Sequence, residues 1–409
     1  MSALPMLEKP PENAPPGPAA GRRPHRPTRP HGPQRKGDWH WQARNAITTV
    51  EALEAALDLT DAERRGARRA VAAGFPMSIT PYYLSLCDAR DPACPIRRQC
   101  VPTAEEGAEV PGDLRDPLGE EEHEVVPSLV RRYPDRVLLL ATDRCGVYCR
   151  FCTRSRMVGD GGGAIARDKL ERIVSWLHAH PEVRDVIVSG GDPLLMATDR
   201  LRAVLAAVRA VPSIDTIRLA SRCPVTMPQR ITTELVRALK GLHPIWLMTH
   251  FNHPKELTPA SERAVARLVD AGFPVMNQTV LLRGVNDDAD VLEQLFRGLI
   301  RRRVRPYYLL QADPVRGTGH LRTPLSTGIA IMERLQGRLT GIALPKLIVD
   351  TPGGRGKVPV GPEYVIARGE GTTSLRTFRG EIVDYVDPPV VSRQSSVDSS
   401  ARAHQKRTT

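Results

Sequence analysis

The sequence lacks any apolar run long enough to cross a membrane, which excludes an integral membrane protein built from helices. Its opening residues lack the continuous apolar stretch of a secretory signal, so we expect a cytoplasmic protein with no membrane partner. Lysine is scarce, with only 8 among the 58 basic residues. The 7 cysteines are an odd number, and without an export signal they favour metal binding or redox chemistry over a disulfide framework.

The net charge of +12 over 409 residues lies mostly at the two ends of the chain. Residues 1–37 carry +5 and residues 390–409 carry +3, which leaves only +4 for the rest. The first segment also holds 10 of the 37 prolines and no aromatic residue, and both ends are therefore predicted to be disordered tails. A basic nucleic-acid-binding protein is the weaker alternative, and we expect no nucleic-acid partner.

Between the tails the predicted secondary structure changes near residue 126, from helices alone to strands that alternate with helices. Residues 38–125 predict an N-terminal helical cap, because 48–51 and 60–63 each fit a capping box before a run rich in Ala, Leu and Arg. Strand-like runs then alternate with helical stretches, which predicts a parallel sheet with right-handed crossovers and favours a full or partial barrel. The runs are 136–141, 185–189, 216–220, 245–249, 275–282, 306–310 and 346–350, and the helices 168–179, 199–210, 228–240, 259–270, 289–302 and 324–337.

Three cysteines follow the first of these strands. Cys145, Cys149 and Cys152 have the spacing C-x3-C-x2-C, and thiolates are the soft ligands of iron–sulfur clusters. Three ligands leave the fourth iron of a four-iron cluster open. The alternatives are a zinc site or buried structural thiols, but structural zinc usually takes four ligands, and no paired C-x2-C follows.

This spacing after the first strand of a parallel barrel resembles the radical S-adenosylmethionine (SAM) superfamily. The string over 143–156 is more specific and resembles the lysine 2,3-aminomutase family. The resemblance implies an α/β fold, with a partial (βα)6-type radical SAM barrel over 126–340 and a C-terminal segment that binds pyridoxal phosphate (PLP) over 341–389. The likeness spans about 38–388 and includes 38–45, 79–83, 132–136, 189–193, 277–280, 322–324 and 350–357.

A glycine-rich turn follows the second strand. Glycines there let the backbone approach a ligand closely, although a plain turn between strand and helix has the same composition. In the family the matching residues bind SAM, and two polar residues after later strands resemble further SAM contacts. The predicted SAM-binding residues are Ser189, Gly190, Gly191, Asp192, His250 and Gln278.

Lys357 ends a second glycine-rich segment. It is not a phosphate-binding loop, because Thr351 replaces the first glycine and Val358 follows the lysine. A lysine on such a loop suits a Schiff base, and in the family the matching lysine holds PLP, whereas the alternative is a solvated surface lysine. By the same resemblance, the residues that hold the PLP phosphate are Arg132, Tyr133 and Arg136.

Two carboxylates close the last parallel strands. Asp313 and Asp350 lie where barrel side chains point into the site, although helix capping is the ordinary role of an aspartate there. In the family this pair binds the distal ammonium of lysine, and Arg154 matches the residue that binds the substrate carboxylate. Both ends of an amino acid would then be held.

The resemblance implies an isomerase, a 2,3-aminomutase that moves the α-amino group of a free basic amino acid to the β-carbon, with L-lysine giving β-lysine. Its cofactors are a [4Fe-4S] cluster, SAM and PLP, and its electron donor is a flavodoxin or ferredoxin. Arginine is the alternative substrate, as in antibiotic biosynthesis, because Leu310 replaces a family tyrosine and lengthens the pocket. A protein lysine on a translation factor is a further alternative. Glutamate is disfavoured because Asp313 and Asp350 repel it.

Other enzyme classes and sites fit less well. A radical SAM methylthiolation enzyme leaves Lys357 unexplained. Asp288 stands where many family members carry a zinc-binding cysteine, and no cysteine follows Cys223, so we expect no structural zinc and leave a homo-oligomer open. The cap cysteines are predicted to be structural, with a second metal site as the alternative; they are Cys87, Cys94 and Cys100.

Overall fold

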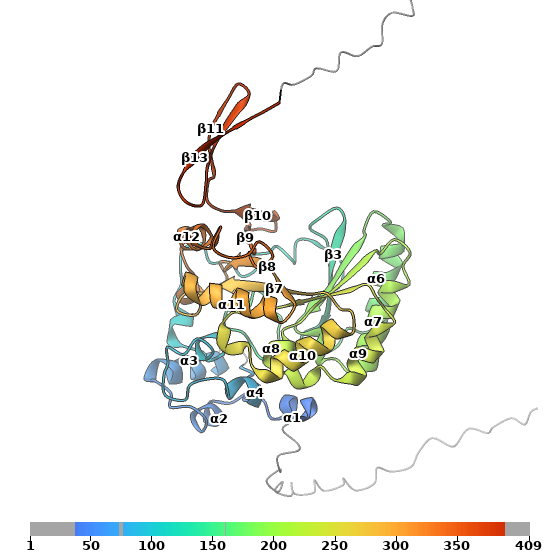
Figure 1. Cartoon of the computed structure of the whole chain (residues 1–409). Coiled ribbons are helices and arrows are strands. Elements are labelled where there is room, and N and C mark those ends of the chain that lie inside the picture. Colours follow the sequence, from blue (N-terminus) through green and yellow to red (C-terminus); the bar gives the residue numbers. More distant parts are fainter. Residues whose placement is uncertain (1–36, 73–76, 160, 389–409) are drawn as a thin grey trace, which may run out of the picture.

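The computed structural model describes residues 37–72, 77–159 and 161–388 (Figure 1). The disordered tails predicted over 1–37 and 390–409 lie outside these residues, apart from Gly37. Within the described ranges, no helix is long and apolar enough to cross a membrane.

Ten strands form one sheet whose order in space is the order along the chain. The strands from β3 to β9 run parallel to their neighbours, while β1, β2 and β10 add antiparallel pairs at the two ends. All seven predicted strand runs lie in the parallel part, so the α/β fold is confirmed. Over the described residues no strand pair joins the two ends of the sheet. The strands are β1 (Glu124–Val126), β2 (Leu129–Val130), β3 (Arg136–Thr142), β4 (Asp185–Gly190), β5 (Thr216–Ala220), β6 (Ile245–Thr249), β7 (Val275–Leu281), β8 (Val304–Gln311), β9 (Lys346–Asp350) and β10 (Lys357–Val360).

Amphipathic helices connect the parallel strands and pack against the outside of the sheet (Figure 1). In α11, residues at helical spacing turn inward: Leu292, Leu295, Phe296 and Leu299 are all fully buried. Truncating such a side chain to alanine costs about 2–5 kcal/mol. The helices are α6 (Arg167–Ala179), α7 (Thr198–Arg209), α8 (Cys223–Thr226), α9 (Thr233–Lys240), α10 (Pro259–Asp270), α11 (Ala289–Arg301) and α12 (Leu325–Leu335), with short 3-10 turns η3 (Pro193–Leu195), η4 (Pro228–Arg230), η5 (Pro254–Glu256) and η6 (Gly319–Leu321).

Short helices before the sheet form the region predicted as a cap. The capping box at the start of α3 is present, since Thr60 N donates to Glu63 Oε2 at 2.7 Å and Glu63 N to Thr60 Oγ1 at 3.2 Å. The box predicted over 48–51 is wrong: Thr49 is the N-cap, and its hydroxyl accepts from Ala52 N, whose alanine side chain cannot complete a box. The elements are α1 (Trp39–Arg44), α2 (Val50–Glu54), α3 (Asp61–Ala72), α4 (Pro81–Leu84), α5 (Arg97–Cys100) and η2 (Ala104–Gly107).

A buried ion pair ties two of these helices together. Arg97 donates from Nε and Nη2 to the carboxylate of Glu63, both at 2.6 Å, and neither side chain is more than 5% exposed. A bidentate bond of this kind fixes direction as well as distance. Glu63 therefore caps α3 and anchors α5 at once.

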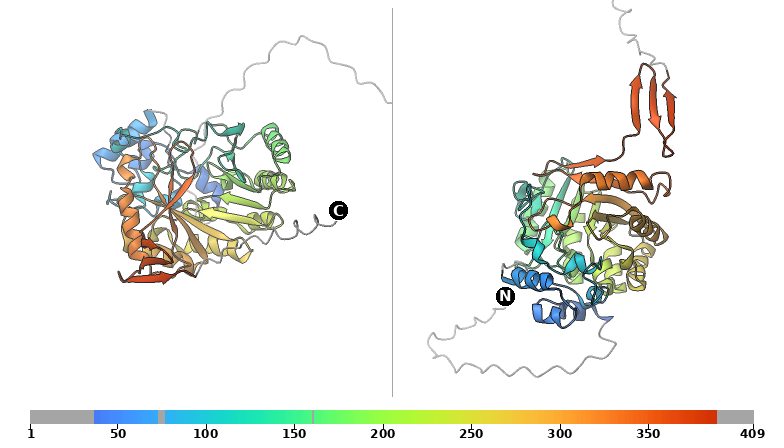
Figure 2. Two further views of the ribbon diagram at one scale, coloured as in Figure 1. Left: turned by 90° about the horizontal axis from the view of Figure 1, so that it is seen from above. Right: turned by 90° about the vertical axis from the view of Figure 1, so that its left-hand side faces the viewer.

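The C-terminal part of the described chain forms a second, three-stranded antiparallel sheet from β11 (Val365–Gly369), β12 (Thr372–Arg376) and β13 (Ile382–Val386). Figure 2 shows this sheet projecting from the body of the molecule. Its apolar side chains are largely exposed, with Ile382 at 57% and Val386 at 72%. The segment expected to begin at 341 contributes β9 and β10 to the main sheet. The domain boundary at 341 stays a prediction.

Candidate active site

Parallel strands present their carboxyl ends at one edge of the sheet, and there the topology gathers most of the predicted site residues. The cluster loop follows β3, Gly190 ends β4, and the polar residues of the later strands complete the set. These later residues are His250 after β6, Gln278 in β7, Asp313 after β8, Asp350 at the end of β9 and Lys357 at the start of β10.

The three cysteines of the loop after β3 lie close together, and none forms a disulfide. Burial raises the pKa of Cys145 well above its ordinary value, and the neighbouring Cys152 raises it further. Burial and the nearby Cys149 likewise raise the pKa of Cys152 to about 11. Thiols crowded in this way become thiolates when cationic iron neutralises them, so this donor set fits a cluster. In the described part of the chain, no three His, Cys, Asp or Glu side chains are arranged around a single metal ion.

The glycine pair after β4 makes room for the protein's own backbone. Gly190 has a φ of +113°, and a Cβ on it would lie 2.3 Å from Thr142 O. A Cβ on Gly191 would lie 2.4 Å from Arg144 O. The end of β4 therefore lies close to the backbone of Thr142 and Arg144, and the predicted approach of these glycines to SAM stays a prediction.

Asp192 joins the segments that follow β4 and β5 at the same edge. Its Oδ1 accepts from Ser221 Oγ at 2.7 Å and from Leu194 N at 3.0 Å, and its Oδ2 accepts from Arg222 N at 2.9 Å. The structure thus gives this buried carboxylate partners from within the chain. Its direct contact with SAM stays a prediction.

His250 and Gln278 meet across neighbouring strands, with Nε2 and Oε1 3.2 Å apart. Burial lowers the pKa of His250 to about 4, and the Arg222 charge adds to that effect. His250 is therefore neutral at pH 7. A neutral imidazole that donates from Nε2 to the Gln278 amide oxygen keeps Nδ1 as an acceptor.

Lys357 faces Asp350 directly across the β9–β10 pair. The Lys357 ammonium contacts Asp350 Oδ2, while Arg132 Nη2 donates to Asp350 Oδ1 at 2.6 Å. Tyr133 Oη accepts from Lys357 N at 2.9 Å, and the Arg136 guanidinium stacks 3.6 Å above the Tyr133 ring. The predicted PLP residues therefore form one group, although they come from segments more than 200 positions apart.

The two aspartates respond differently to their surroundings. Burial raises the pKa of Asp313 to about 7, and the nearby charge of Asp350 raises it further. Burial acts upward on Asp350 too, but Lys357 and Arg132 hold its pKa below the ordinary value. Among the described residues, Asp350 pairs with Lys357 and Arg132, whereas Asp313 forms no ion pair.

Asp313 should make the cofactor-free chain less stable as pH rises. Because its folded pKa of about 7 lies above the unfolded value of 3.8, the folded chain binds more protons between about pH 4 and 7, so its stability falls across that window. At 1.36 kcal/mol per pKa unit the loss is at most roughly 4 kcal/mol. We expect Asp313→Asn to remove it, as measured by urea unfolding at pH 4.5 and 8. An equal pH dependence in parent and variant would contradict the assignment.

Arg154 has a partner that the sequence did not indicate. It donates from Nε to Glu120 Oε1 at 2.9 Å and from Nη1 to Ser189 Oγ at 3.3 Å. Glu120 is only 3% exposed, and Arg156 binds its other oxygen. The role of Arg154 toward a substrate carboxylate stays a prediction, and Glu120 would compete for it.

Arg222 is a second residue that sequence reasoning missed. It follows β5, and its Nη1 donates to Cys149 Sγ at 2.9 Å. Its position at the carboxyl end of a parallel strand was the available signal, since the other site residues share it.

The cap cysteines lie together near this group. The sulfur atoms of Cys87 and Cys100 are 3.8 Å apart, and Cys94 Sγ accepts from Asp88 N at 3.3 Å. All three thiols are free. Their predicted structural role stays a prediction.

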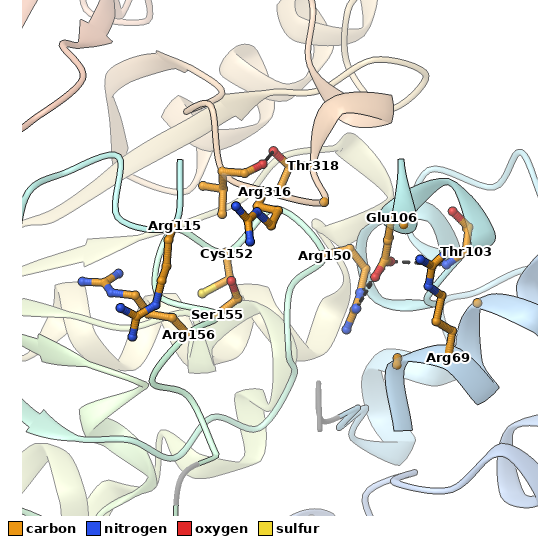
Figure 3. A pocket seen from close by; sticks show the side chains of 15 residues that line it. Arg69, Thr103, Glu106, Arg115, Arg150, Cys152, Ser155, Arg156, Arg316 and Thr318 are labelled. Carbon is orange, nitrogen blue, oxygen red and sulfur yellow. Dashed lines mark hydrogen bonds and ion pairs between the residues drawn. The ribbon is translucent and has the colours of Figure 1, made fainter. Parts of the chain in front are cut away.

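A cavity of about 250 Å³ lies on the cap side of the cluster loop (Figure 3). Cys152 is the one predicted site residue in its lining, which also includes five arginines. Three of these are in ion pairs: Arg150 with Glu106, Arg156 with Glu120 and Arg115 with Glu121. The cavity therefore flanks the cluster ligands and is separate from the residues predicted to bind substrate.

Comparisons with known proteins agree over most of the chain. A family model described as lysine-2,3-aminomutase matches residues 332–408, and the radical SAM superfamily model matches residues 139–295. The chain is 47% identical to the L-lysine 2,3-aminomutase of Fusobacterium nucleatum subsp. nucleatum, over 88% of this chain and 85% of that protein. It is 48% identical to the L-lysine 2,3-aminomutase of Clostridium subterminale, over 86% and 84% respectively.

Two further likenesses are weaker. The chain is 39% identical to the glutamate 2,3-aminomutase of Clostridioides difficile, over 89% of this chain and 87% of that protein. Among solved structures, a radical SAM methyltransferase from Sphaerobacter thermophilus has 21% identity and a TM-score of 0.39, over 54% of this chain and 68% of that one. At that TM-score the overlap has no bearing on function.

Proposed function

Because the chain belongs to the lysine 2,3-aminomutase family, a family of radical SAM isomerases, we propose that it converts free L-lysine to β-lysine. The observation that carries the choice of a basic substrate is the pair of carboxylates, Asp313 and Asp350, at neighbouring strand ends. Burial raises the pKa of Asp313 to about 7, and Asp350 lies close enough for its charge to raise it further. A substrate ammonium between them would neutralise both.

The residues of the site fit three cofactors. When bound, a [4Fe-4S] cluster with SAM supplies the hydrogen-abstracting radical, and PLP supplies the ring that delocalises the unpaired electron. Cys145, Cys149 and Cys152 would hold the cluster. Lys357 would bind the PLP aldehyde, and Arg132 and Arg136, on either side of Tyr133, would hold its phosphate. The residues that would hold SAM are Ser189, Gly190, Gly191, Asp192, His250 and Gln278.

Asp350 has two successive tasks in this scheme. In the free chain its Oδ2 holds a proton of the Lys357 ammonium, while Arg132 binds Oδ1. With PLP bound, the Lys357 nitrogen would be held at the cofactor aldehyde and would leave Asp350 Oδ2 free. The carboxylate is then available to the distal ammonium of lysine, together with Asp313.

Charge also separates the candidate substrates. A glutamate side chain would meet the two carboxylates and be repelled. Arginine remains the second candidate because of Leu310, which stands where the family tyrosine is expected. Leu310 packs against the apolar group that contains Val280 and Leu282.

The proposed partners follow from the chemistry. The cluster needs one electron per activation, which we assign to a flavodoxin or ferredoxin. The exposed apolar side chains of β11–β13, among them Ile366 at 51%, support a homo-oligomer.

A substrate panel tests the proposal. Anaerobically reconstituted protein with SAM, PLP and dithionite is given lysine, arginine, ornithine and glutamate separately, and the products are resolved by chromatography with mass detection. We expect β-lysine as the main product, formed at least about tenfold faster than any other β-amino acid, which corresponds to roughly 1.4 kcal/mol of discrimination. A preparation with an intact cluster that leaves all four amino acids unchanged would overturn the assignment.

A further inference from the structure

Arg222 links the cluster loop to the rest of the protein. It lies two residues after the end of β5 and 73 positions from Cys149, to whose sulfur it donates at 2.9 Å. Its side chain is only 10% exposed. A buried cation therefore touches one of the three predicted cluster ligands.

The guanidinium is fixed by several elements at once. Nη2 donates to Glu256 Oε1 at 2.9 Å, to Tyr83 Oη at 3.0 Å and to Gln99 Oε1 at 2.5 Å. Nε donates to His250 O at 3.2 Å, and the Tyr83 and Phe151 rings each lie 5.3 Å from the guanidinium carbon. These contacts hold the guanidinium against Cys149 from four other segments of the chain.

We propose that Arg222 is a positioning residue that makes the cluster easier to reduce, through its N–H···Sγ bond to Cys149 and its fixed positive charge. This inference rests on the proposed function, because it requires the cluster. When a reduced one-electron carrier gives up an electron, the cluster becomes more negative by one charge. A nearby cation and hydrogen bonds to cluster sulfur stabilise that state and raise the reduction potential.

Glu256 provides the opposing influence. Its side chain is fully buried, and it accepts from Arg222 and from Tyr83 Oη, the latter at 2.7 Å. Its negative charge offsets part of the charge that Arg222 presents to Cys149. The potential should therefore depend on both residues, in opposite directions.

The test is the midpoint potential of the reconstituted holoenzyme, measured by redox titration with electron paramagnetic resonance. We expect Arg222→Gln to make one-electron reduction about tenfold less favourable, a shift of about 59 mV to more negative potential. Glu256→Gln should shift the potential to more positive values, and Arg222→Lys should fall between the parent and Arg222→Gln. The matched control is Arg209→Gln, since within the described chain the hydrogen bonds of the Arg209 side chain go to backbone carbonyls between α7 and the start of β6, including Leu242 O at 3.2 Å.

The opposite signs of the two shifts in midpoint potential distinguish an electrostatic effect of Arg222 on the cluster from a purely structural role. Arg222→Gln and Glu256→Gln break the same ion pair, so a purely structural role predicts shifts of the same sign, or none, and that result would overturn the inference. If Arg222→Gln does not retain a cluster, Arg222→Lys and Glu256→Gln still decide the sign. The measurement needs no amino-acid turnover: a parent chain without a four-iron signal refutes the cluster itself, whereas an inactive parent with the predicted shifts refutes only the substrate assignment.

Discussion

Replacing Lys357 with alanine should abolish aminomutation, with turnover lowered by roughly 10³-fold or more. The amine is the group that would bind the PLP aldehyde. Lys346, which is exposed at the start of β9, lies at the opposite end of the strand that Asp350 closes. The variant should bind the cluster normally, because none of the three cysteines contacts Lys357 in the described structure.

The measurement for Lys357 should not depend on turnover alone. Borohydride reduction of the PLP-loaded parent should attach the cofactor to a peptide containing residue 357, as read by mass spectrometry. Lys346→Ala is the matched control and should keep both the label and the activity. A label on another lysine, or full turnover in Lys357→Ala, would remove Lys357 from its proposed role.

Replacing Asp350 with asparagine should lower kcat/KM for lysine by about 10²-fold or more. Breaking a buried ion pair costs about 3–5 kcal/mol, because the remaining charge is left without its counter-ion. Here Arg132 loses its counter-ion, and the distal ammonium of the substrate loses one of two carboxylates. An amide also turns an N–H donor toward one of these two cations, each of which needs an acceptor.

The comparison for Asp350 uses the same isosteric change elsewhere. Asp215 is exposed just before β5, at the opposite edge of the sheet, where its ion pair with Arg184 is long, at 3.8 Å. Asp215→Asn should leave the kinetics of lysine conversion unchanged. Unaltered lysine kinetics in Asp350→Asn, with the cluster and PLP both bound, would refute the proposed contact with the substrate cation.

Regular elements were predicted from the sequence because their signals are local. The runs 216–220, 245–249 and 346–350 agree residue for residue with β5, β6 and β9. Short buried strands flanked by turn residues carry that signal within a few positions. The helix expected over 228–240 begins only at Thr233, since Pro228–Arg230 form a separate 3-10 turn and Thr232 caps the helix.

Contacts between distant side chains could not be predicted in the same way. Glu120 binds Arg154 from 34 positions away, and Arg222 reaches Cys149 across 73. Nothing in the spacing of these residues requires them to meet. Only the order of the strands and the path of the cap bring them together.

The hairpin between β9 and β10 gives the length of its loop an importance that loops seldom have. Surface loops commonly accept insertions at little cost. Here Asp350 and Lys357 are register partners, and Gly353, Gly354 and Gly356 turn the chain between them with φ of +75°, +73° and +106°. Because side chains alternate along a strand, one inserted residue that shifted β10 would point Lys357 to the opposite face. For protein engineering, the six residues 351–356 between Asp350 and Lys357 are a spacer of fixed length. Grafting a longer loop here would separate the lysine from its carboxylate without altering either residue.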